Sequence, residues 1–125
     1  MTEPADAVSL LKQLSAEIGW GVGRIQAQAG VLAVSVAVGM GWDEADILKA
    51  RVIAELTLVD TAGALLTDKG RTIYRQIERE WCADISSDQR QIGLSCVQLL
   101  LGIPVIWPAN QTVCELLQKN YDMLG

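Results

Sequence analysis

The chain has 125 residues, a formal net charge of −5 and no histidine. This length suits one domain with one core, and the lack of histidine excludes triad hydrolysis through histidine and most zinc catalysis. Because no motif pairs a nucleophile with a base, we expect no enzyme, no catalytic or metal site and no cofactor.

The cysteines and the apolar segments indicate a cytoplasmic protein. The three cysteines are widely spaced and form no Cys-x-x-Cys pair, so we expect reduced thiols packed as small apolar residues, with a redox-sensing thiol as the alternative. The acidic N-terminus does not resemble a signal peptide. The most apolar run, Ala29 to Trp42, has fourteen residues, fewer than the roughly twenty that a membrane span needs.

The first forty residues predict two helices separated by a glycine turn. Apolar residues at helical spacing indicate a helix over about residues 4–18, after Thr2-Glu3-Pro4. Three glycines, at positions 19, 21 and 23, predict a break in the chain. Residues 25–40 fit either a strand or a buried helix, and their alanines together with Gly39-Met40-Gly41 favour the helix.

The middle of the chain predicts a helix, a small hairpin and another helix. Asp43 can cap a helix that runs to Leu56. Residues 57–60 and 64–66 then read as two short strands around Thr61-Ala62-Gly63. Thr67 can cap the helix that follows, which continues to Trp81.

The last third predicts two more helices joined by an apolar connector. Ser86 and Gln89 have the spacing of a capping box at the start of a helix that runs through Leu101. Pro104 ends this helix, residues 105–108 form the connector, and Asn110 can cap the last helix.

Residues 38–101 resemble the MarR-type winged-helix transcriptional regulators. Four segments carry the resemblance. GMGWDEADILKARVIAEL is similar to the recognition helix of that family, and LTLVDTAGALLTDKGR is similar to its wing. IYRQIEREW is similar to the helix after the wing, and ISSDQRQIGLSCVQLLLG to the dimerising helix. The resemblance implies a mostly α fold, a winged helix-turn-helix with a very short β-hairpin wing and additional C-terminal helices. Within a single domain, 1–125, the winged-helix part covers about 28–82 and the C-terminal helical dimerisation part about 86–125.

The resemblance also implies a dimeric transcriptional regulator that binds a palindromic DNA site. The residues that would contact DNA are Lys49, Arg51, Lys69, Arg71 and Arg75. The net charge opposes DNA binding, and the segment that resembles the recognition helix has more acidic than basic residues.

These charges leave a second function open, that of an acidic winged-helix module for protein interaction or oligomerisation that does not bind DNA. The partner would then be another protein or a second copy, and no membrane is involved. The apolar segment Gly93–Trp107 either completes the monomer core or forms a homodimer interface. The residues expected at that interface are Val97, Leu100, Leu101, Ile103, Ile106 and Trp107. The tryptophans also leave open a pocket for a small ligand.

Overall fold

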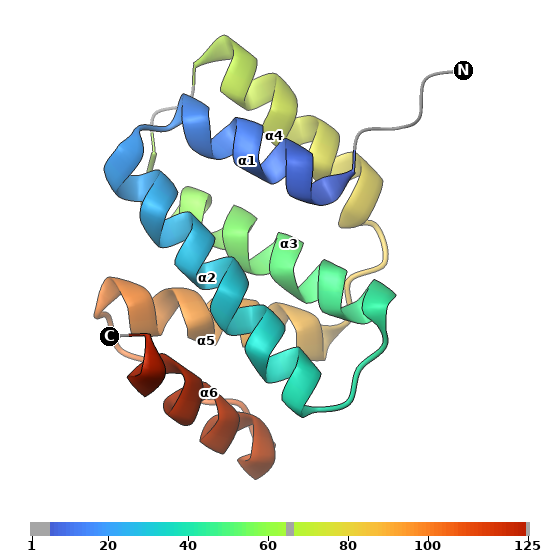
Figure 1. Ribbon diagram of the computed structural model, residues 1–125, viewed down its shortest axis with the longest axis vertical. Coiled ribbons are helices and arrows are strands. Elements are labelled where there is room, and N and C mark those ends of the chain that lie inside the picture. Colours follow the sequence, from blue (N-terminus) through green and yellow to red (C-terminus); the bar gives the residue numbers. More distant parts are fainter. Residues whose placement is uncertain (1–5, 65–66, 125) are drawn as a thin grey trace.

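The computed structural model describes residues 6–64 and 67–124, which form a bundle of helices (Figure 1). Helix α1 lies beside α4 at one side of the bundle, α2 and α3 occupy the middle, and α5 and α6 lie at the other side (Figure 1). The helices are α1 Ala7–Glu17, α2 Trp20–Gly39, α3 Glu44–Thr61, α4 Asp68–Trp81, α5 Ser87–Leu101 and α6 Gln111–Met123.

Helix α3 is the centre of the molecule because two apolar clusters share it. One cluster joins α3 to α2, α5 and α6, and the other joins it to α1 and α4. On α3, Ala50, Ala54 and Leu58 belong to the first cluster, whereas Val52, Leu56 and Val59 belong to the second. This helix is therefore covered on most of its circumference by its neighbours.

The predicted glycine turn between the first two helices is shorter than expected. The break consists of Ile18 and Gly19, and Gly19 has a φ of +90°, a conformation that glycine adopts without strain. Gly21 and Gly23 lie inside α2 instead. A Cβ atom on Gly23 would lie 2.4 Å from Ser15 Oγ, so this glycine lets α1 approach α2 closely.

The segment predicted as either strand or helix is helical, and α2 is longer than expected at 20 residues. By length and composition alone it could span a membrane. Nearly half of it is buried, and α1, α3, α5 and α6 all pack against it. These contacts are compatible with the core helix of a soluble protein, which passes the same test of length and hydropathy.

The prediction of a β-hairpin wing over residues 57–66 is wrong. Residues 57–61, which include the first predicted strand, are the last turns of α3, and the part of the chain that the structure describes contains no strand. Leu58 and Val59 are buried, and their burial in two clusters outweighs the preference of short β-branched runs for strands. A hairpin of two such short strands would be marginal by itself. Most of the second predicted strand, residues 65–66, lies outside the described residues.

The predicted helix starts after residue 40 are confirmed by their capping hydrogen bonds. Four side chains accept a hydrogen bond from a backbone N–H three residues later, namely those of Asp43, Thr67, Ser86 and Asn110. Ser86 and Gln89 form the complete capping box, since Gln89 Oε1 also accepts from the Ser86 N–H at 2.9 Å. Helix α5 ends at Leu101, before the predicted stop at Pro104, and its C-cap is Gly102, which has a φ of +68°.

Candidate functional site

Two of the residues predicted to contact DNA lie on the central helix. Lys49 and Arg51 are half-buried in the first half of α3, which packs against both α2 and α5. The Arg51 Nε atom donates to Glu55 Oε2 at 2.8 Å. Arg51 is thus held by an internal ion pair, and the helix that resembles a recognition helix is a core helix in this bundle.

The other three predicted DNA contacts lie on α4. Lys69 Nζ lies 3.7 Å from Glu17 Oε1, and the Arg71 guanidinium pairs with Asp68. Arg75 is exposed on the same helix. Lys69 and Arg71 belong to the first turn of α4 and Arg75 to its middle, whereas Lys49 and Arg51 lie on a different helix, α3.

The residues predicted for the dimer interface divide between the core and the surface. Val97 is fully buried in the cluster formed by α2, α3, α5 and α6. Leu100 and Leu101 are half-buried at the end of α5. Ile103, Ile106 and Trp107 are exposed by 41%, 62% and 43%, and we call these three residues the connector surface.

The backbone of the connector is held against α5. The Ile103 N–H donates to the Gln98 carbonyl at 3.1 Å, and the Ile106 N–H donates to Gln98 Oε1 at 2.8 Å. Ser95 Oγ donates to the Ile106 carbonyl at 3.0 Å. These bonds satisfy both buried side chains, Ser95 and Gln98, and they fix the backbone of Ile106 on both sides. The backbone that carries the connector surface is therefore held in place by hydrogen bonds to α5.

The connector surface lies within a long stretch without charge. The sequence has no charged side chain between Arg90 and Glu115, and the segment Gly102–Pro108 is largely exposed. Large exposed apolar side chains that are scattered singly are ordinary, but a contiguous group of them marks an interaction site. This connector is the most concentrated group of exposed large apolar residues along the described chain.

A buried polar cluster between α2 and α3 was not expected from the sequence. Glu55 is only 3% exposed, and its carboxylate accepts hydrogen bonds from Arg51 and from Gln26 Nε2. Gln26 Nε2 also donates to the Leu11 carbonyl at 3.1 Å. Burial raises the pKa of Glu55, while the hydrogen bonds and charge of Arg51 act in the opposite direction. The cluster links α1, α2 and α3, and its side chains do not line the two hollows beside Trp42 that are described below, so we interpret it as structural.

The cysteines are free thiols in three different environments. Cys96 is fully buried, and burial raises its pKa to about 12. Burial also raises the pKa of Cys82, helped by the nearby charge of Glu78. Cys114 Sγ donates to the Pro108 carbonyl at 3.0 Å. Thiols with raised pKa values are poor nucleophiles, so Cys82 and Cys96 are better described as packing residues than as reactive ones.

A scan against protein-family models and searches of curated proteins and of solved structures gave no significant match to this chain. The interpretation of its function therefore depends on its own residues and their geometry.

Proposed function

We propose that this protein is a helical interaction module that pairs with a second copy of itself through the connector surface. The observation that carries the proposal is the exposure of Ile106 and Trp107 on an uncharged segment whose backbone is held by α5. Aromatic and aliphatic anchors of this kind supply most of the binding energy in protein interfaces. Pre-ordering of the backbone also reduces the entropy that association would cost.

The charge of the chain restricts where a second copy could bind. Two copies that each carry a net charge of −5 repel each other at long range, and this repulsion costs least where the contacting surfaces carry no charge of their own. The connector surface carries no charged side chain of its own, and along the chain its nearest charged residues are Arg90 and Glu115. In space, Asp88 comes near the end of the connector, because it lines one cavity with Pro108. In a twofold dimer the same patch of both copies forms the interface, so Ile106 and Trp107 would pack against the connector surface of the other copy. A cytoplasmic location fits this proposal, since the free thiols suit a reducing compartment.

The competing proposal is that the protein regulates transcription by binding DNA. Its support is the three exposed basic residues on α4 that were predicted to contact DNA, Lys69, Arg71 and Arg75. Two of these three cations already face the acidic side chains of Glu17 and Asp68. For this reason we favour self-association over DNA binding.

The test of self-association is sedimentation velocity at protein concentrations from about 1 to about 100 µM. We expect a concentration-dependent dimer for the wild type, and we expect Ile106→Asp to weaken it by at least about 30-fold, because association would bury an unpaired carboxylate. Val38→Asp is the matched control, since Val38 is similarly exposed, at 58%, on α2. Circular dichroism checks that both variants keep their helices.

A wild type that stays monomeric at the highest concentration would refute the proposal. An equal loss of association in both variants would refute the assignment to the connector surface, because Val38 lies on α2 and not on the connector.

A further inference from the structure

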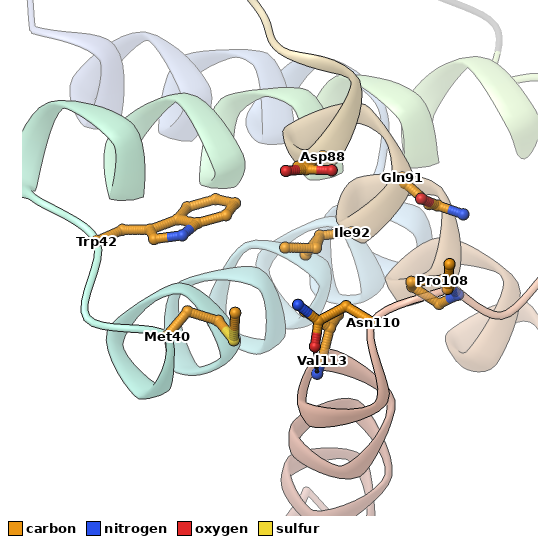
Figure 2. Close-up of a pocket in the computed structure, with 9 residues that line it drawn as sticks. Met40, Trp42, Asp88, Gln91, Ile92, Pro108, Asn110 and Val113 are labelled. Atoms are coloured by element: carbon orange, nitrogen blue, oxygen red, sulfur yellow. Dashed lines mark hydrogen bonds between the residues drawn. The ribbon is translucent and has the colours of Figure 1, made fainter.

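A small cavity lies where three distant parts of the chain meet. It has a volume of about 230 Å³ and lies between the turn after α2, the first turns of α5 and the start of α6. Figure 2 shows the side chains of Met40, Trp42, Asp88 and Ile92 around this space. Its volume is below the roughly 300–1,000 Å³ of pockets for drug-sized ligands, so an occupant would be a small molecule.

The walls of the cavity are mainly apolar. Trp42 is half-buried, and its indole ring extends toward Ile92 on α5, with Met40 on the neighbouring side (Figure 2). Val113 and Pro108, both buried, contribute further apolar surface. The ring of a tryptophan carries negative electrostatic potential on its face and attracts cations to it.

The charged group on the cavity wall is a carboxylate without a partner. Asp88 is exposed in the first turn of α5, where the helix dipole favours negative charge. Among the described residues, no hydrogen bond or ion pair involves its side chain, and none of the residues that line the cavity is lysine or arginine. The cavity thus combines an aromatic wall with a carboxylate that has no side-chain partner among the described residues.

The surroundings of Trp42 add to this negative charge. A second hollow of about 250 Å³ shares Trp42 and Asp88 with the first, and it is also lined by Asp46 and Asp84. Carboxylates of one sign that line neighbouring hollows raise the local concentration of cations. No cluster of three or more metal-ligating side chains occurs in the described part of the chain, which favours an organic cation over a metal ion.

We propose that this cavity binds a small organic cation whose ammonium group lies between the Trp42 indole and the Asp88 carboxylate. The apolar walls formed by Met40 and Ile92 suit the carbon body of such a ligand. Asn110 Oδ1 already accepts from the Val113 N–H, which leaves the amide nitrogen of Asn110 to donate to an oxygen of the ligand. This site goes beyond the proposed self-association and does not depend on it.

The test compares two probes of the same shape and different charge by nuclear magnetic resonance. Choline carries a quaternary ammonium group, and 3,3-dimethylbutan-1-ol is its uncharged isostere. The indole N–H signal of Trp42 is identified by its loss in Trp42→Phe. We expect choline to shift this signal saturably with a dissociation constant of about 1 mM or below, and the isostere to bind at least about tenfold more weakly.

The variant that tests the carboxylate is Asp88→Asn. We expect it to weaken choline binding by about tenfold and to remove the preference for choline over its isostere. Glu80→Gln is the matched control because it changes the net charge by the same amount as Asp88→Asn. Glu80 is exposed on α4 and does not line the cavity. No saturable shift with choline, equal binding of both probes, or choline binding unchanged in Asp88→Asn would overturn the proposal.

Discussion

Glu55 is the residue whose environment departs furthest from what its chemical type prefers. A carboxylate on a core helix loses its hydration, and here Arg51 and Gln26 replace part of it with hydrogen bonds. Gln26 Oε1 has no hydrogen-bond partner among the described residues, so the cluster is not fully satisfied. Polar groups in this state favour one specific packing of the helices around them, because any shift would cost their remaining hydrogen bonds.

The raised pKa of Glu55 predicts a specific dependence of stability on pH. Burial raises this pKa in the folded state above the ordinary value of 4.5, so the folded state holds the proton at pH values where the unfolded chain has lost it. The contribution of Glu55 to the free energy of unfolding is therefore highest below pH 4.5 and falls as the pH rises through the folded-state pKa. Glu55→Gln removes this titration.

Urea unfolding at a series of pH values checks the prediction. The free energy of unfolding of the wild type, minus that of Glu55→Gln, is expected to decline as the pH rises from 4.5. Glu80→Gln, on the exposed part of α4, controls for the change in net charge. A difference that stays constant with pH would show that Glu55 does not titrate differently in the folded state.

At the scale of elements, the close approach of α2 to α3 depends on a glycine. A Cβ atom on Gly30 would lie 2.2 Å from Glu55 Oε2, so any side chain there would displace the buried carboxylate. A comparable approach brings α5 to α3, where a Cβ atom on Gly93 would lie 3.2 Å from the Ala54 backbone nitrogen. Small residues at these contacts let the helices of the central layer pack closely.

Two glycine substitutions in α2 are expected to have opposite effects. Gly30→Ala should lower the free energy of unfolding by about 1–3 kcal/mol, because it forces the Glu55 side chain to move. A Cβ atom on Gly21 would have no neighbouring atom within 4 Å. Gly21→Ala should therefore raise the free energy of unfolding by about 0.4–1 kcal/mol, because alanine lowers the entropy of the unfolded chain. Chemical denaturation measures both. A neutral or stabilising Gly30→Ala would contradict the packing of Glu55 against α2.

At the scale of the whole molecule, the charged residues are unevenly distributed along the chain. The long uncharged stretch between Arg90 and Glu115 covers most of α5 and the connector, whereas α3 and α4 carry many of the charged residues. This distribution favours contact between two copies through the exposed, uncharged connector. It also leaves the basic residues of α4 beside acidic ones, which limits their attraction to phosphate.

The distribution of charge predicts no binding to mixed-sequence duplex DNA. Fluorescence anisotropy of labelled duplex DNA at about 20 mM salt tests this prediction, because electrostatic attraction between protein and DNA is screened only weakly at that salt concentration. We expect no increase in anisotropy at protein concentrations where the dimer forms. Binding that weakens steeply with added salt and is reduced in Arg75→Ala would instead support the DNA-binding proposal.

Local signals in the sequence were sufficient to place most of the helices. Capping side chains act within three residues of the helix start, so Asp43, Thr67, Ser86 and Asn110 could be recognised without knowing the fold. The same is true of the uncharged connector. By contrast, the sequence did not show that Val97, one of the six residues predicted for the dimer interface, belongs to the core, because its burial depends on helices that are distant in sequence.

By itself, then, the sequence determined that the chain is mostly helical, where the four helices after residue 40 begin, and that the segment around Ile106 is uncharged. These features depend on neighbours along the chain. Only the tertiary structure decided that residues 57–61 extend α3, that Arg51 pairs with a buried glutamate, and that Trp42 and Asp88 line one cavity. Each of these depends on which distant surfaces cover a residue, and burial between packed helices outweighs the weak local preferences on which a sequence-based prediction relies.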